Sequence, residues 1–156
     1  MVTAQPDGEA KPRQGGRSAR RRSRELALQG IYEWLVGGQD VAAVEGHLME
    51  SEGVERADRP HLREVLHGVI DGADALRAQF VGFLDRTPEQ LSPVEHGILL
   101  IGTYELQQRP EIPYRVVINE AVELAKSFGG TEGFRYVNGV LDKVAARLRP
   151  QEANAR

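Results

Sequence analysis

Apolar residues recur at helical spacing along almost the whole chain, and this pattern constrains the fold more than any other feature. The clearest instance is the series Phe134, Val137, Leu141, Val144 and Leu148, with steps of three and four residues. Such steps place one apolar face along a helix. The sequence contains no extended alternation of apolar and polar residues, the pattern typical of a half-buried strand. The sequence therefore predicts an all-α protein.

Helix start and stop residues divide this pattern into six predicted helices with short connections. The first begins near Ser18, and Gly37 and Gly38 end it. Because short connections make consecutive helices antiparallel neighbours, helical bundles are expected. The predicted helices cover residues 18–36, 41–50, 60–86, 93–109, 114–127 and 131–149.

The stretch SPVE at residues 92–95 has the residues of a helix start. Ser92 is the expected N-cap, proline follows at the first helical position, and Glu95 completes a capping box. Gly68 and Gly72 lie inside the long helix predicted over 60–86, where each glycine costs about 1 kcal/mol of helix propensity. We expect both glycines to allow the close approach of a neighbouring helix.

The composition limits the class of protein. A chain of 156 residues forms one domain or two closely packed subdomains. It has no cysteine, which excludes disulfides and cysteine-based chemistry. No apolar run approaches the ~20 residues of a membrane span, and the N-terminus lacks the apolar core of a signal peptide. A cytoplasmic location is expected.

Positive charge is concentrated at one end of an acidic chain. Residues 1–24 carry a net charge of +5, whereas the whole chain carries −3 and the remainder −8. Residues 1–17 are rich in glycine, proline and glutamine, and are predicted to be disordered. Residues 150–156 are expected to be a C-terminal tail.

The arginine run, defined as Arg20, Arg21, Arg22 and Arg24, lies where the first helix is predicted to begin. Positive charge opposes the helix dipole at that position, so an anionic ligand is expected there. The four side chains are expected to project beyond the core and to contact nucleic-acid phosphates. The alternative is a basic segment that is simply solvated.

No motif indicates an enzyme, a metal centre or a cofactor site. Glu64 and His67 match half of a helical di-iron motif, but a second copy is absent, which favours a polar helix face. The stretch GGTEG at 129–133 lacks the lysine of a phosphate-binding loop and matches a helix end instead. Tyr136 lies off the apolar stripe of its helix and is the aromatic residue expected to be exposed for base stacking.

Three segments together resemble the NusB family of bacterial transcription antitermination factors. They are ARRRSRELALQGIYEW at 19–34, IPYRVVINEAVELAKSFGG at 112–130 and RYVNGVLDKV at 135–144. The likeness extends over residues 18–149, although residues 37–90 match in helix pattern more than in letters. It implies two packed three-helix bundles, one over about 18–87 and the other over about 92–149.

The resemblance also implies a function without catalysis. Members of the family pair with NusE, a small-subunit ribosomal protein, and the pair binds single-stranded boxA RNA. The resulting complex helps RNA polymerase to resist termination on ribosomal RNA operons. When NusE is absent, a monomer or a homodimer is expected.

The resemblance assigns roles to individual residues. The arginine run is expected to contact the RNA backbone, and Glu132, Tyr136 and Asn138 are expected to contact bases or sugars. Tyr32 and Glu95 are expected near the NusE interface. A packed aromatic side chain and a capping glutamate are the alternative interpretations of these last two residues.

Two other functions are alternatives to this one. A helical protein–protein adaptor would have the same fold without sequence-specific RNA binding. A NusB-like domain also occurs in ribosomal RNA cytosine methyltransferases, so the chain could be a stand-alone relative of that domain. Those enzymes require a catalytic domain with a nucleophilic cysteine, and this sequence has no cysteine.

Overall fold

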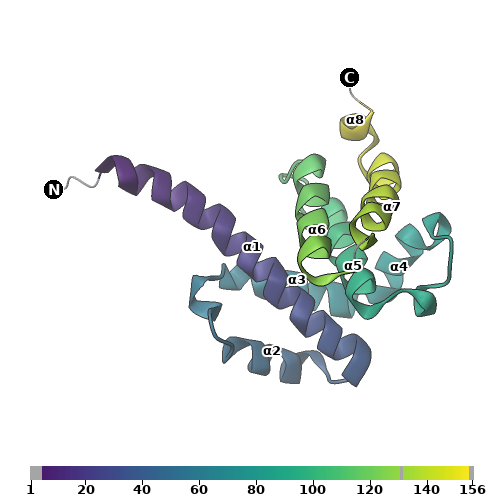
Figure 1. The fold of residues 1–156 in the computed structure, drawn as a ribbon, viewed down its shortest axis with the longest axis horizontal. Helices are drawn as coiled ribbons and strands as arrows, with labels where there is room; N and C mark the ends of the chain where they lie inside the picture. The colour runs from purple at the N-terminus through teal and green to yellow at the C-terminus, as the bar shows by residue number, and fades with distance from the viewer. Residues whose placement is uncertain (1–4, 131, 155–156) are drawn as a thin grey trace.

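A computed structural model describes residues 5–130 and 132–154, and every regular element within these ranges is a helix (Figure 1). The all-α prediction is confirmed. Three short 3-10 helices, η1 (Val54–Arg56), η2 (Val81–Phe83) and η3 (Pro88–Gln90), lie in the connections. The α-helices are α1 (Gln5–Gly37), α2 (Val41–Met49), α3 (Arg59–Asp71), α4 (Ala73–Phe80), α5 (Pro93–Gln108), α6 (Tyr114–Phe128), α7 (Gly133–Leu148) and α8 (Pro150–Ala153).

α1 begins earlier than its sequence pattern indicates. Its first residue is Gln5, so the start predicted near Ser18 is wrong and the arginine run lies inside the helix. The apolar stripe marks only the part of α1 that packs on the body, whereas the first turns extend away from it (Figure 1). Helix also replaces the disorder predicted for residues 1–17 from Gln5 onward, and residues 1–4 lie outside the described part.

The long helix predicted over 60–86 is divided in two. Gly72 ends α3 with φ −107° and ψ 19°, and α4 starts at the next residue. The N–H of Gly72 donates to the carbonyl of Gly68 at 3.1 Å, which closes the last turn of α3. The chain then changes direction, and α4 packs mainly against α5. The predicted continuous helix is therefore wrong.

α5 is the centre of the molecule. Every residue from Gly97 to Leu106 is buried, and α5 contacts α1, α3, α4, α6 and α7. The buried apolar residues of the described chain form one continuous cluster around it. This arrangement is compatible with two bundles that share α5, but the division into units over 18–87 and 92–149 stays a prediction.

Glycines allow the helices around α5 to approach closely. A β-carbon on Gly68 would lie 2.2 Å from Cε1 of Tyr104, and one on Gly102 would lie 2.8 Å from Cδ1 of Leu141. The close approach predicted at Gly68 is therefore confirmed. The same prediction is wrong for Gly72, because its β-carbon would meet the Gly68 carbonyl of its own helix at 3.0 Å.

Arg149 holds the C-terminal end of the chain against α5. This side chain is buried, and its guanidinium donates to the carbonyls of Leu106 at 2.9 Å, Ile112 at 2.6 Å and Arg109 at 2.8 Å. These carbonyls lie at and just beyond the end of α5, where a helix leaves acceptors unpaired. The predicted tail 150–156 is thus helical over α8, and Glu152 accepts from the N–H of Tyr114 at 2.8 Å.

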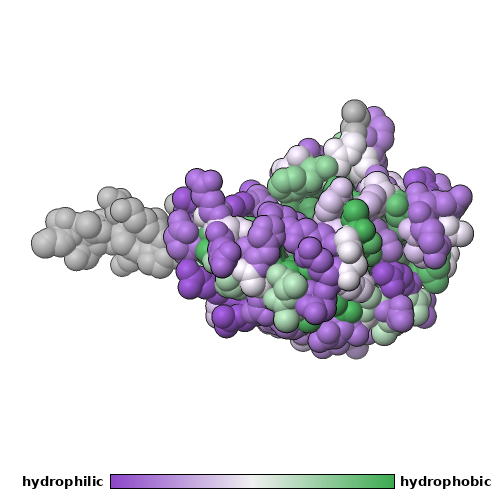
Figure 2. Space-filling view, turned by 90° about the horizontal axis from the view of Figure 1, so that it is seen from below, coloured by the Kyte–Doolittle hydropathy of each residue, from purple (hydrophilic) through white to green (hydrophobic). Residues whose placement is uncertain are grey.

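Polar side chains dominate one face of the molecule. The face seen from below in Figure 2 is largely hydrophilic, with small apolar areas between the polar side chains. None of the described helices combines the length and the apolar character that crossing a membrane requires.

Gly68→Ala should lower the free energy of unfolding by about 1–3 kcal/mol, because the added methyl group overlaps the Tyr104 ring. Gly139→Ala is the matched control, since a β-carbon there meets no described atom within 4 Å. Alanine at 139 should instead stabilise α7 by about 0.5–1 kcal/mol. Urea unfolding of both variants measures the difference, and an unchanged Gly68→Ala variant would contradict the close packing of α3 on α5.

Candidate functional site

The arginine run does not form one uniform exposed cluster. Successive residues of a helix point about 100° apart, so the four side chains meet different surroundings. Arg21 is 46% exposed, whereas Arg24 is 5% exposed. Arg20 is exposed as well, and its nearest carboxylate is Asp58, with 3.8 Å between Nε and Oδ2.

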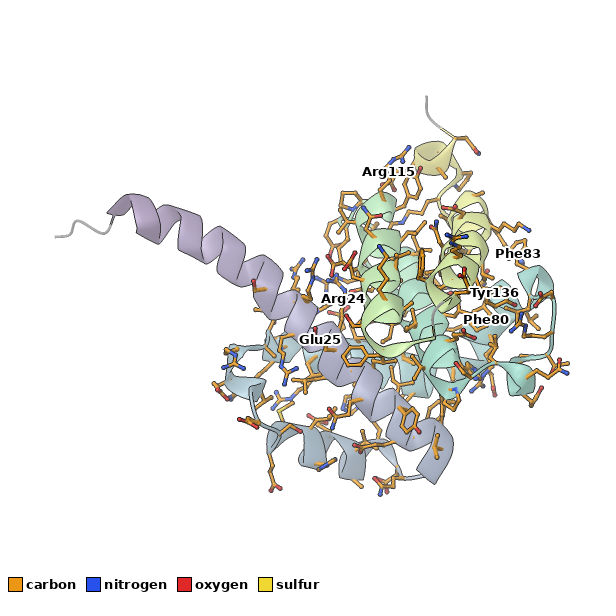
Figure 3. All side chains as sticks on the ribbon, viewed as in Figure 1. Arg24, Glu25, Phe80, Phe83, Arg115 and Tyr136 are labelled. Carbon is orange, nitrogen blue, oxygen red and sulfur yellow. The ribbon has the colours of Figure 1, made fainter. Side chains whose placement is uncertain are left out.

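Arg24 is part of a buried ion pair at the junction of α1, α5 and α6 (Figure 3). Its Nε donates to Oε1 of Glu105 at 2.9 Å, and its Nη2 lies 3.3 Å from Oε2. Nε2 of His61, from α3, lies 2.8 Å from the same Oε2. The prediction that Arg24 projects beyond the core is therefore wrong. It lies on the apolar stripe of α1, and Glu105 supplies a charge that makes its burial tolerable.

Glu105 is ionised in this cluster. Burial raises the pKa of its carboxyl, but the hydrogen bond from His61 and the charge and hydrogen bond of Arg24 outweigh burial, so its pKa is lowered overall. A buried carboxylate bonded by a guanidinium and an imidazole is strongly tied to its partners. The cluster therefore fixes the rotation of α1 against α3 and α5.

Arg22 reaches from α1 to the turn before η1. Its Nη2 donates to the carbonyl of Glu52 at 2.8 Å, and its Nη1 to Glu25 at 3.1 Å. A β-carbon on Gly53 would lie 2.9 Å from Nη2 of Arg22 and 3.1 Å from Nη2 of Arg56, and Gly53 has a φ of 87°. The two guanidinium groups therefore meet beside Gly53, at the place where another residue would have its β-carbon. Sequence reasoning missed Arg56, because Arg56 comes close to Arg22 only through the turn at Gly53, some thirty residues further along the chain.

Arg21 pairs with α6. Its Nε and Nη2 donate to Oε1 and Oε2 of Glu120 at 3.1 Å and 2.9 Å. The hydrogen bond to Glu120 and the charge of that carboxylate raise the pKa of Arg21. Nothing in the local sequence around either residue indicates this contact, which joins positions 99 residues apart.

The predicted contacts on α7 fall into two groups. Glu132 and Asn138 are exposed, with Glu132 3.4 Å from Nε of Arg135. Tyr136 is partly buried: its hydroxyl donates to Oδ1 of Asp85 at 3.0 Å, and the Arg86 guanidinium lies 4.3 Å from its ring centre. The segment after η2 therefore packs on part of this side chain, and base stacking on the part that stays exposed remains a prediction. α7 contacts α4 and η2, the elements that hold Phe80 and Phe83 (Figure 3).

Tyr32 lines an open groove of about 390 Å³ between α1, α5 and α6. Its side chain is exposed, and so is that of Phe128 across the groove. The interpretation of Tyr32 as a packed core residue is thus excluded. An apolar floor with charged residues at the edge is typical of a protein-binding surface. The lining residues are Arg22, Glu25, Leu28, Gln29, Tyr32, Glu33, Val94 and Phe128.

Glu95 follows Val94 of the groove and has a structural role in the described chain. Its N–H donates to Oγ of Ser92 at 3.1 Å, which confirms the predicted N-cap of α5. The return bond of a capping box does not occur among the described residues. The carboxylate reaches the start of α7 instead, where a β-carbon on Gly133 would lie 2.7 Å from its Oε2. A carboxylate is favourable near a helix N-terminus.

The described residues contain no group of three side chains that could hold a metal ion. Glu64 accepts from Tyr104 at 3.0 Å and pairs with Arg109, whereas His67 bonds Glu45 at 2.7 Å. Glu64 and His67 therefore bind separate partners, as expected for a polar helix face.

Comparison with known proteins gives a consistent result. The family model described as the NusB family matches residues 21–146. The Transcription antitermination protein NusB of Ralstonia nicotianae is 55% identical over 152 residues, which is 97% of this chain and 98% of its own length. The protein of the same name from Bordetella pertussis is 54% identical over 147 residues, 92% of this chain and 96% of its own.

Solved structures show the same fold. T. maritima NusB matches with a TM-score of 0.76 and 26% identity, over 86% of this chain and 95% of its own. A chain from a crystal structure of the antitermination factors NusB and NusE with dsRNA matches with a TM-score of 0.71 over 81% of this chain and 96% of its own. At 17% identity, this second match shows the fold alone.

Glu105→Gln should lower the free energy of unfolding by about 3 kcal/mol, because it removes the carboxylate bonded to the buried Arg24 and leaves only Glu120, 3.8 Å away, near its charge. Replacing Arg24 and Glu105 together by methionine should recover most of the loss, since no unpaired charge then stays between the helices. Urea unfolding measures both effects. A Glu105→Gln variant within 1 kcal/mol of the unmodified chain would contradict the buried pair.

Proposed function

Because the chain belongs to the NusB family, we propose that it is a transcription antitermination factor that binds boxA-type RNA together with NusE. The single observation that carries the proposal is the 55% identity to a Transcription antitermination protein NusB over 97% of this chain and 98% of that protein. It acts by binding rather than by catalysis, without a cofactor, in the cytoplasm. Its assembly places RNA and NusE next to RNA polymerase in an antitermination complex.

The RNA surface begins on the outer side of α1. Arg20 offers a partly exposed guanidinium group to phosphates, the exposed guanidinium of Arg21 is already bonded to Glu120, and Arg22 together with Arg56 adds positive charge beside Gly53. Arginine binds phosphate through paired hydrogen bonds as well as charge. Arg24 has a different role, because its buried pair with Glu105 orients α1.

The RNA surface continues on α7 through the exposed residues Glu132 and Asn138, which contact bases or sugars. The exposed part of Tyr136 contributes a further contact to a base or sugar. Its contacts with Asp85 and Arg86 hold the segment after η2 beside α7.

NusE binds at the groove of α1, α5 and α6. Tyr32 and Phe128 supply exposed aromatic surface on either side, with Leu28 and Val94 beneath them. Exposed aromatic residues over an apolar floor form the centre of many protein interfaces. Glu95 contributes indirectly, because its carboxylate at Gly133 holds the start of α7 next to this groove.

Fluorescence anisotropy of a labelled boxA-type RNA and a scrambled RNA, with and without NusE, tests the proposal. We expect a preference for the boxA-type RNA that increases when NusE is added. A salt series separates base contacts from phosphate contacts, because phosphate binding weakens steeply with salt. Equal binding of both RNAs under all conditions would contradict sequence-specific recognition and leave a helical adaptor.

Arg20→Ala is the informative variant in this assay, since Arg20 is exposed and only loosely paired with Asp58. Loss of one phosphate contact should reduce the salt dependence of log K by about 0.7 per log unit of salt. Arg63→Ala is the matched control, because it removes an exposed arginine that pairs with Glu45 on the surface formed by α2 and α3. Equal effects of the two variants would remove Arg20 from the RNA surface.

Tyr32→Asp should weaken NusE binding about thirtyfold or more, because it puts a charge into the centre of the apolar groove. Val81→Asp is the control, since Val81 is 44% exposed and Tyr32 43%, but Val81 lies on η2 outside the groove. Isothermal titration calorimetry with NusE measures both. Undiminished binding by Tyr32→Asp would show that NusE binds elsewhere.

A further inference from the structure

We propose that Glu120 of α6 competes with RNA phosphates for Arg21 and thereby limits the affinity of the arginine run for single-stranded RNA. The inference rests on the proposed function, because it concerns the same RNA surface. It assigns to Glu120 a positioning role that acts through Arg21 and involves no contact of its own with RNA.

The pairing of Arg21 and Glu120 uses the atoms that a phosphate would use. Nε and Nη2 of Arg21 donate to the two carboxylate oxygens at 3.1 Å and 2.9 Å, one bond to each oxygen. Arginine binds a phosphate through the same parallel pair of N–H groups. The carboxylate therefore occupies the Nε–Nη2 edge of the guanidinium, one of the two edges through which arginine binds a phosphate with paired N–H groups.

Glu120 is held in place by more than Arg21. Its side chain is only 12% exposed, and its Oε1 lies 3.8 Å from Nη1 of Arg24. Arg24 is itself fixed by the buried pair with Glu105. The charge of the buried Arg24 therefore attracts the Glu120 carboxylate and favours its position next to Arg21.

The surroundings of the pair are acidic. A small cleft of about 140 Å³ beside Arg21 is lined by three carboxylates, Glu25, Glu120 and Glu123, together with Leu124 and Ser127. The bond to Glu120 and the charges of all three carboxylates raise the pKa of Arg21. A phosphate that approaches from the α6 side meets like charge before it reaches the guanidinium.

RNA must therefore displace Glu120 to bind this edge of Arg21, whereas Arg20 is only loosely paired. An RNA that offers phosphates alone gains little binding free energy from this exchange. For each arginine–phosphate pair that forms, the arginine–glutamate pair of Arg21 and Glu120 is broken. Tight binding then depends on contacts to bases and on NusE. In this way Glu120 lowers the background affinity for unrelated RNA.

Glu120→Gln in the full chain should raise the affinity for both the boxA-type and the scrambled RNA about fivefold, the size of a partly exposed ion pair. Its log K should also depend more steeply on salt, by about 0.7 per log unit, because one more phosphate is bound. Glu45→Gln is the control: it removes the same charge from another arginine–glutamate pair, that of Glu45 with Arg63 at 2.8 Å on the surface formed by α2 and α3, and should change affinity less than twofold.

A double-mutant cycle tests the coupling to Arg21. Arg21→Ala should weaken RNA binding less than twofold in the unmodified chain and about fivefold in the Glu120→Gln background. An equal gain from Glu120→Gln with and without Arg21 would overturn the proposal, since the effect would then be one of total charge. No gain at all would overturn it as well.

Thermal unfolding confirms that the variants are folded. If the Glu120→Gln variant does not fold, Glu120→Asp is used in its place. Aspartate keeps the charge beside Arg24 but is too short to bond both N–H groups of Arg21. A smaller gain in affinity is then expected, and its absence overturns the proposal. RNA binding that no Glu120 variant changes contradicts this role only, whereas lack of RNA binding by every protein contradicts the proposed function too.

Discussion

The buried carboxylate of Glu105 determines how the central helices fit together. It lies in the most buried stretch of α5 and binds Arg24 from α1 and His61 from α3. A buried charge needs its partners in a narrow range of positions, because any loss of contact leaves it desolvated and unpaired. α1 can therefore adopt only one rotation on α5, and the positions of all its other side chains follow from that rotation.

Both candidate surfaces of the molecule depend on this one helix. Arg20 and Arg21 lie on its outer side before the buried pair, and Tyr32 lies in the groove two turns after it. A long, well-anchored helix transmits the position of one surface to the other with little freedom to bend. The RNA surface and the partner groove are thus held in a fixed relation without a hinge between them.

Regular features of the fold followed from the sequence, whereas the pairings between distant charges did not. Helical spacing, the Ser92 cap and the close approach at Gly68 were all correctly predicted, because each depends on local chemistry or on a face of one helix. Arg24 lay on the apolar stripe, and Glu105 interrupts an apolar run. Those two observations could have indicated a buried pair, but only the fold shows that they meet. The contacts of Arg21 with Glu120 and of Tyr136 with Asp85 span 99 and 51 residues, and no local pattern encodes them.

The opposite charges of the two parts of the chain have a physical consequence for binding. The segment up to residue 24 carries +5 and the remainder −8, so attraction of RNA is limited to one end of an otherwise repulsive surface. Within that end, Glu105 neutralises Arg24 and Glu120 neutralises Arg21. The positive charge that RNA meets is therefore smaller than the sequence suggests. A surface of this kind binds weakly by charge alone, so its selectivity has to come from base contacts and from a second protein.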